Sequence, residues 1–141
     1  MEFDFTNETI VKIGKNVFEN LFVRFSKFFE KKSGKISLII VDDKKIRKIN
    51  SEYRGFDEPT DVISFEYADD SFVVGGENIV AVGDIFISLD TAKRQAKEHG
   101  HSLDKEFEIL FVHGLLHVIG FDHKNDKEEK EMEKQAKKIL G

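Results

Sequence analysis

The pattern of apolar and polar positions switches between the helical and the strand period along the chain. Apolar residues recur at three- and four-residue spacing from Ile10 to Phe28, which predicts an amphipathic helix running to about Lys31. Residues 2–5 before it predict a short strand, and the apolar run at 35–42 predicts a buried one. The first third of the chain is thus expected to form a strand, a helix and a second strand.

Strand and helix signals continue to the end of the chain. Asp42 or Asp43 can cap a short helix, and strand patterns follow at 62–67 and 79–88, with a glycine turn at 75–76 between them. Three more helices are predicted, over about 88–100, 103–119 and 125–140. This mixture of strands and helices indicates the α+β class, with a small mixed β-sheet packed on helices.

Length and composition predict one soluble domain covering residues 1–141. The chain has a mass of 16.2 kDa, is 40% hydrophobic and shows no repeat, low-complexity tract or linker. No apolar run approaches the roughly 18 residues of a membrane span, and the N-terminus does not read as a signal peptide. The absence of cysteine excludes disulfides and thiolate metal sites. We therefore expect a cytoplasmic protein with no membrane contact.

The charges are distributed unevenly along the sequence. The net charge is −5, yet residues 24–54 hold ten Lys or Arg against four acids, whereas residues 55–92 hold nine acids and no Lys or Arg. Such polarity is typical of a chain that presents a basic face to phosphates, but it is equally typical of an ordinary solvated surface.

The segment HGLLHVIGFDH at 113–123 carries the chemistry that the sequence reveals most clearly. His113 and His117 are four residues apart, so on a helix they share one face. Gly120 can take the left-handed conformation that ends a helix and turns His123 back towards them. Three neutral imidazoles predict one divalent metal ion, most consistent with Zn, with Ni, Co or Fe as alternatives. The predicted site thus lies on a buried helix of the C-terminal half and the turn after it.

Three protein ligands leave one coordination position for a water molecule, which the cation can activate as the nucleophile of a hydrolysis. Asp122 either orients a ligand imidazole or caps the turn. His99 and His101 flank Gly100 in a predicted loop and are interpreted as ordinary surface residues.

Gly114 stands where the H-E-x-x-H zinc proteases carry their general-base glutamate. Without that carboxylate, peptide hydrolysis is disfavoured. The missing side chain is expected to leave space beside the metal for a substrate bulkier than a peptide. Phosphodiester hydrolysis is still feasible, provided that a positive group lies near the phosphate.

Three segments together resemble the YbeY family of bacterial rRNA maturation factors, and the resemblance covers essentially the whole chain. They are NSEYRGFDEPTDVISFE at 50–66, VGDIFIS at 82–88 and HGLLHVIGFDH at 113–123. The family pattern P-T-D-V-L-S-F-P falls on 59–66, where Ile63 replaces a usual Leu and Glu66 replaces a common Pro.

The resemblance implies a zincin-like core and assigns roles to individual residues. His113, His117 and His123 would be the metal ligands, with His117 and Arg54 as catalytic residues and Arg54 also binding substrate. Arg54 belongs to the family's N-x-x-Y-R pattern, which falls on Asn50, Tyr53 and Arg54. Asp61, Asp84 and Asp122 are further candidates that would shape the site.

The resemblance also implies a function: a metal-dependent, single-strand-specific endoribonuclease that matures the 3′ end of the small-subunit rRNA and acts in ribosome quality control. The implied partners are ribosomal RNA or the small subunit, and a ribosomal protein or assembly GTPase. Two alternatives stay open, a non-enzymatic ribosome-assembly factor with a structural metal and, less favoured, a metalloprotease.

Overall fold

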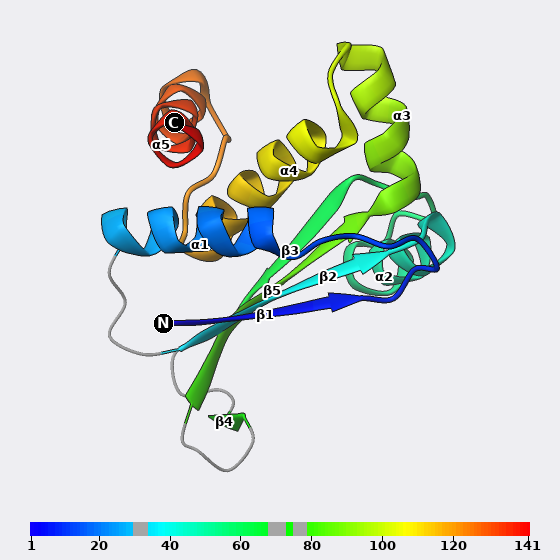
Figure 1. Cartoon of the computed structure of the whole chain (residues 1–141), viewed down its shortest axis with the longest axis horizontal. Helices are drawn as coiled ribbons and strands as arrows, with labels where there is room; N and C mark the ends of the chain where they lie inside the picture. The colour runs from blue at the N-terminus through cyan, green and yellow to red at the C-terminus, as the bar shows by residue number, and fades with distance from the viewer. Residues whose placement is uncertain (30–33, 68–72, 75–78) are drawn as a thin grey trace.

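The computed structural model describes residues 1–29, 34–67, 73–74 and 79–141 (Figure 1). The elements in these ranges are β1 (Glu2–Asn7), α1 (Asn16–Phe28), β2 (Lys35–Val41), α2 (Asp43–Arg54), β3 (Val62–Glu66), β4 (Val73–Val74), β5 (Ile79–Ser88), α3 (Leu89–His99), α4 (Leu103–Val118) and α5 (Asp126–Leu140). The predicted glycine turn at 75–76 lies outside the described residues. The predicted α+β class, with a small mixed sheet packed on helices, is confirmed.

The predicted caps explain where several helices begin. The side chains of Asp42, Ser88 and Asn125 accept hydrogen bonds from backbone N–H groups in the first turns of α2, α3 and α5. α2 and α3 each end at a glycine, Gly55 or Gly100, in the left-handed conformation. The bounds of α3 and α5 agree with the predictions to within about two residues.

The first helix is shorter than its apolar pattern predicted. α1 begins at Asn16, and Ile10 is fully exposed, so the prediction of a helix from Ile10 is wrong. The Asn7 side chain accepts a hydrogen bond from Thr9 N–H and donates one to the Val11 carbonyl. This local bonding offers the backbone an alternative to the helix, and the apolar spacing did not reveal it.

The sheet has the order β1-β2-β5-β3, and β4 pairs with β5 beside it. β1, β2 and β5 run parallel, while β3 is antiparallel to β5 and forms the edge of this order. β4 was not predicted from the sequence. The exposed edge of β3 matters for function, because the candidate site lies along it.

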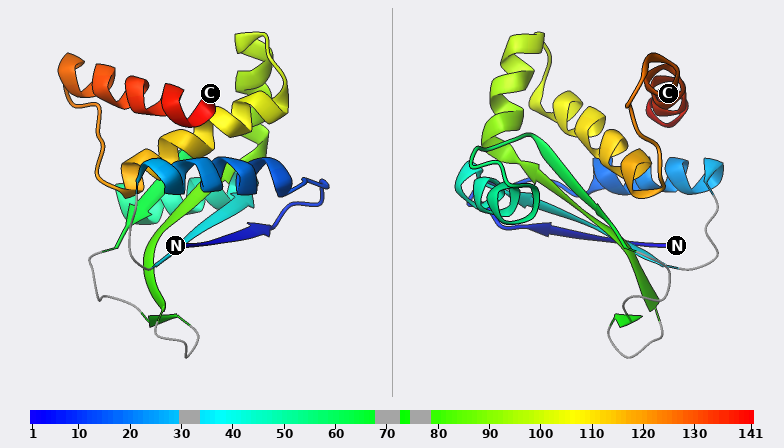
Figure 2. Two further views of the ribbon diagram at one scale, coloured as in Figure 1. Left: turned by 60° about the vertical axis from the view of Figure 1, so that its left-hand side comes forward. Right: turned by 180° about the vertical axis from the view of Figure 1, so that it is seen from behind.

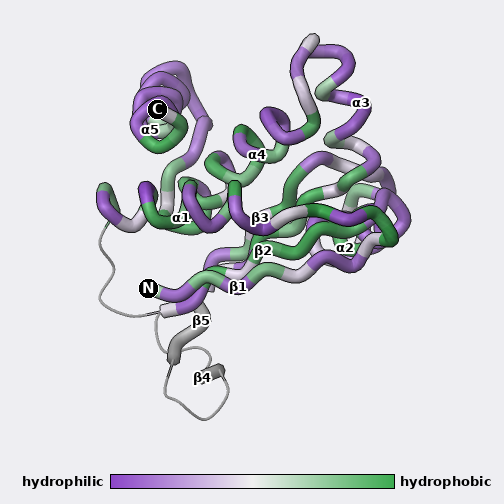
Figure 3. Tube along the Cα trace, viewed as in Figure 1, coloured by the Kyte–Doolittle hydropathy of each residue, from purple (hydrophilic) through white to green (hydrophobic). Residues whose placement is uncertain are grey.

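Helices cover both faces of the sheet (Figures 1 and 2). α1 and α4 pack on one face over a core that includes Phe18, Phe111 and Ile85, all fully buried, and α5 packs on α1 and α4. α2 packs on the other face through Ile46 and Ile49. Figure 3 shows the resulting contrast between β2, whose residues are largely hydrophobic, and α5, whose residues are mostly hydrophilic.

Within the described ranges, no helix combines the length and apolar character that crossing a bilayer requires.

Candidate active site

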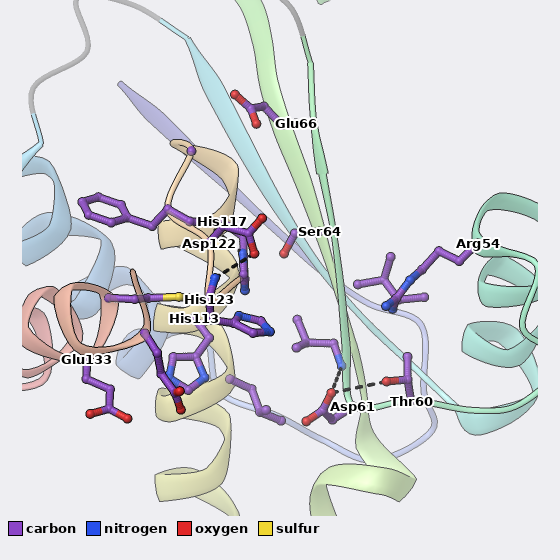
Figure 4. A pocket seen from close by; sticks show the side chains of 17 residues that line it. Arg54, Thr60, Asp61, Ser64, Glu66, His113, His117, Asp122, His123 and Glu133 are labelled. Carbon is purple, nitrogen blue, oxygen red and sulfur yellow. Dashed lines mark hydrogen bonds between the residues drawn. The ribbon is translucent and has the colours of Figure 1, made fainter. Parts of the chain in front are cut away.

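A pocket opens between β3, the C-terminal half of α4, the turn after α4, and α5 (Figure 4). The sequence predicted part of its lining. Among the residues around it are Arg54, Asp61, Ser64, Glu66, His113, His117, Asp122, His123, Glu129 and Glu133. The three histidines and Arg54, which lie up to 69 positions apart in the sequence numbering, therefore share one pocket.

The turn after α4 places His123 close to His117. Gly120 has a φ of 104°, and Phe121 N–H donates to the Leu116 carbonyl while Gly120 N–H donates to that of His117. This pair of bonds is the Schellman arrangement that ends a helix at a left-handed residue. The two imidazole centroids then lie 5.2 Å apart. The predicted role of Gly120 in the turn is confirmed.

The same turn orients the His117 ring. His117 Nδ1 lies 3.0 Å from the Phe121 carbonyl oxygen, and since a carbonyl can only accept, Nδ1 carries the proton. In the neutral ring, the lone pair is then on Nε2. A hydrogen bond of this kind commonly fixes the tautomer of a metal-binding histidine.

His117, Asp122 and His123 each offer a ligand atom, and these atoms all lie within 4.8 Å of one another. They form a group that could hold a metal ion. His113, one turn back on α4, faces the same pocket but lies outside this tight group. The Asp122 carboxylate also accepts a hydrogen bond from His123 N–H at 2.7 Å. It therefore caps the turn and lies beside the ring nitrogens at the same time.

Burial favours the neutral histidine in this pocket. It lowers the pKa of His113 and of His117, and the positive charge on neighbouring imidazoles lowers both further. The negative charges of Asp61 and Glu133 partly oppose this shift at His113. The neutral imidazole is the form that binds a cation, so the pocket favours the state that a metal needs.

Gly114 does not leave space beside the histidines, and the expectation that it would is wrong. A Cβ at this position would lie 2.6 Å from Ile85 Cγ2, well inside van der Waals contact. The fully buried Ile85 of β5 fills the space that a side chain would need. Gly114 thus lets α4 lie close against the sheet, which explains why no larger residue stands there.

Gly114→Ala should therefore lower the free energy of unfolding by about 1–3 kcal/mol, the usual cost of forcing an extra methyl group into a packed core. Denaturant unfolding followed by circular dichroism measures this change. Gly14→Ala is the matched control, since a Cβ at Gly14 would meet no heavy atom within 4 Å. Equal effects of the two substitutions would contradict this explanation of Gly114.

Arg54 reaches the pocket from the opposite side of β3 (Figure 4). It is the last residue of α2, and the loop after it is held where the Asn50 side chain donates to the Glu58 carbonyl at 2.9 Å. No described acid lies within ion-pairing distance of Arg54, so its guanidinium is free for a ligand.

The two other candidate aspartates differ in position. Asp61 lines the pocket, and its carboxylate accepts a hydrogen bond from Val62 N–H. Asp84 does not line it; its carboxylate accepts a hydrogen bond from the Tyr67 hydroxyl at 2.7 Å. The structure therefore brings Asp61, but not Asp84, to the histidines.

Sequence reasoning missed a second group that could hold a metal ion. His99 and His101, interpreted as ordinary surface residues, both contact Oε1 of the buried Glu106, at 3.1 and 2.5 Å. The left-handed Gly100 between them turns the chain so that both rings meet the first turns of α4. The H-x-H spacing was visible in the sequence, but nothing in the sequence distinguished Glu106 from the other acidic residues as their partner.

The pocket is rich in acids that the sequence did not single out. Its described lining has five carboxylates and one arginine, and Glu66, Glu129 and Glu133 were not predicted. Since α5 carries acids along much of its length, no sequence signal distinguished the two that face the pocket. Such a lining attracts a cation and repels a phosphate that arrives without one.

The sequence model of the family described as "Endoribonuclease YbeY" matches residues 2–141. The chain belongs to the YbeY family. Its curated relatives named "Endoribonuclease YbeY" include those of Pelotomaculum thermopropionicum, 46% identical over 75% of this chain and 70% of the relative, and Geobacillus sp., 41% identical over 99% and 94%. The protein of Bacillus licheniformis is 49% identical over 74% of this chain and 69% of its own length.

The fold is also similar to a solved structure. The solution structure of TM1509 from Thermotoga maritima matches with a TM-score of 0.63 and 23% identity, over 99% of this chain and 89% of that one.

Membership of the YbeY family confirms that the chain is an enzyme of the hydrolase class, a nuclease. The metalloprotease alternative is thereby set aside.

Proposed function

We propose that this YbeY protein is a metal-dependent endoribonuclease that cuts single-stranded RNA. The observation that carries the proposal is that Arg54 and the three histidines line one pocket from opposite sides of the β3 edge. A strand of RNA that crosses this edge would place a phosphate between a guanidinium and the histidine cluster. The names of the curated relatives support the same activity.

His113, His117 and His123 are proposed to hold the cation, with Asp122 in reach of it. The donors suit Zn or a related transition metal, since neutral imidazoles are ligands of borderline cations. The Nδ1 hydrogen bond of His117 and the lowered pKa of His113 and His117 support this assignment. When bound, such a cation supplies Lewis-acid chemistry at a phosphate and an activated water.

Arg54 is proposed to bind the phosphate and to stabilise the charge that develops on it. Its guanidinium is always ionised and can donate two hydrogen bonds to phosphate oxygens. Phosphate binding should depend strongly on Arg54, because the carboxylates that line the rest of the pocket repel RNA. RNA binding should therefore depend on both Arg54 and the cation.

The cellular role is proposed from the resemblance to the family. We infer that the substrate is ribosomal RNA, at the 3′ end of the small-subunit RNA, in maturation and quality control of ribosomes. The partners would be the small subunit and a ribosomal protein or assembly GTPase, and the location would be the cytoplasm. We further propose that residues 1–141 act as a single domain.

The proposal is tested with purified protein and one labelled RNA, offered as a single strand and as a duplex with its complement. We expect internal cleavage of the single strand, loss of cleavage after chelation, and recovery on adding Zn²⁺, Ni²⁺ or Co²⁺. Cleavage that persists unchanged in the chelated protein would overturn the metal dependence. Binding of both RNAs without any cleavage would overturn the proposed action on single-stranded RNA.

A further inference from the structure

The end of α2 exposes two aromatic side chains next to Arg54. Tyr53 is 68% exposed and Phe56 is 55% exposed. Arg54, the last residue of α2, and Gly55 stand between them in the sequence. Gly55 is left-handed, with a φ of 77°, and turns the chain there. Two large rings that flank a pocket arginine and remain in solvent are surface that a ligand could cover.

The Tyr53 ring is held in place from one side. It packs edge-on against Phe65 of β3 with centroids 5.3 Å apart, and Phe65 packs edge-on against Phe86 of β5 at 5.9 Å. Phe65 and Phe86 are themselves packed against the smaller core cluster under α2. The ring is thus anchored on the sheet while much of its surface stays free.

Phe56 lies beside the guanidinium that faces the pocket. The Cζ atom of Arg54 is 6.0 Å from the centroid of the Phe56 ring, within the range of a cation–π contact. Arg54 lines the pocket and Phe56 does not, so the ring lies outside the pocket, beside a residue that lines it. The aromatic surface therefore continues the site beyond Arg54.

The exposed face of α2 favours a polyanion. Lys44 and Lys48 are exposed and make no ion pair within the described residues. Arg47 on the same face forms an ion pair with Asp57 of the following loop, so the arginine neutralises the charge of that acid. Glu52 lies on the same face, so three positive side chains stand there against two acids. A phosphate backbone that leaves the acidic pocket past Arg54 would therefore meet a net positive charge along α2.

We propose that Tyr53 and Phe56 form a stacking site for unpaired nucleobases, on the α2 side of the β3 edge, next to the phosphate bound by Arg54. This inference rests on the proposed ribonuclease function and deepens it. Bases of a single strand can turn out and stack on aromatic rings, whereas bases of a duplex stay stacked on one another. The stacking site would thus select single-stranded RNA.

The first test follows cleavage of a 12-nucleotide single-stranded RNA by the metal-loaded enzyme. Loss of one stacked base typically weakens binding several-fold to about 100-fold, so we expect Tyr53→Leu to raise KM about tenfold with little change in kcat. Tyr53→Phe should retain the wild-type KM, because it keeps the ring. Phe28→Leu, which alters an aromatic residue of α1 that is 53% exposed, is the matched control and should leave KM unchanged.

The second test reads stacking without cleavage. The chain has no tryptophan, so Tyr53→Trp introduces a single indole fluorophore. Its emission should be quenched by the single-stranded RNA and not by the duplex. Removing single bases from the RNA should reveal a position at which an abasic site raises KM for wild type but not for Tyr53→Leu.

The outcomes separate the two claims. If wild type cleaves RNA while Tyr53→Leu keeps the wild-type KM and the indole is not quenched, the stacking site is wrong and the ribonuclease function stands. If wild type cleaves no RNA and the indole does not respond to it, both are wrong. Quenching by duplex as strongly as by single strand would contradict selection by stacking.

Discussion

Replacing Arg54 with alanine is expected to lower kcat for RNA cleavage by about 100-fold or more, with no change in metal binding. Loss of one preorganised donor to a developing oxyanion typically costs two to three orders of magnitude. Arg54 is exposed and forms no described ion pair, so the fold should not depend on it. Single-turnover cleavage and metal titration of the same preparations measure the two effects.

Arg94→Ala is the matched control for this substitution. Arg94 is also an exposed arginine, but it lies on α3, outside the pocket, and pairs with Asp43. It should retain wild-type cleavage. Arg54→Lys should recover only part of the activity, because an ammonium keeps the charge but not the two-pronged donor geometry. Full activity of Arg54→Ala would remove Arg54 from the reaction.

The second large effect concerns the metal. His117→Ala should weaken Zn²⁺ binding by about 100-fold or more and abolish cleavage. Even the loss of a residue that only hydrogen-bonds to a metal ligand lowers metal affinity or activity about 10- to 100-fold. His117 is the histidine whose ring the Phe121 carbonyl orients, and it belongs to the tight group with Asp122 and His123. Isothermal titration with Zn²⁺ measures the affinity.

The control is His101→Ala, in the second group of described residues that could hold a metal ion. We expect it to leave the metal affinity that supports cleavage unchanged, because His101 meets Glu106 at the α3–α4 turn and does not line the pocket. The reverse result, with cleavage lost in His101→Ala and kept in His117→Ala, would show that the metal needed for cleavage binds at the α3–α4 turn.

Local sequence rules predicted much of the fold. The strand run at 35–42, the caps at Asp42 and Ser88, and the turn at Gly120 each depend on a few neighbouring residues, and each was found. The helix predicted from Ile10 was wrong because its apolar spacing competed with local hydrogen bonding around Asn7. The sequence also did not predict that β3 would form an antiparallel edge.

The site was predictable where its residues lie in one segment. His113, His117 and His123 are close in sequence, so their spacing already indicated a shared cation. The approach of Arg54 from across β3 depends on strand order, and only the resemblance to the family linked it to the histidines. Gly114 shows the limit of motif comparison: a missing glutamate suggested empty space, whereas the fully buried Ile85 occupies it.

The most direct measurement compares wild type, His117→Ala and Arg54→Ala, purified identically, on one end-labelled single-stranded RNA with and without added Zn²⁺. Circular dichroism establishes first that all three are folded. Cleavage by wild type alone, and only with metal, is the predicted result. Equal cleavage by all three would show that the activity does not arise from the histidine and Arg54 pocket, and would contradict the proposed endoribonuclease site.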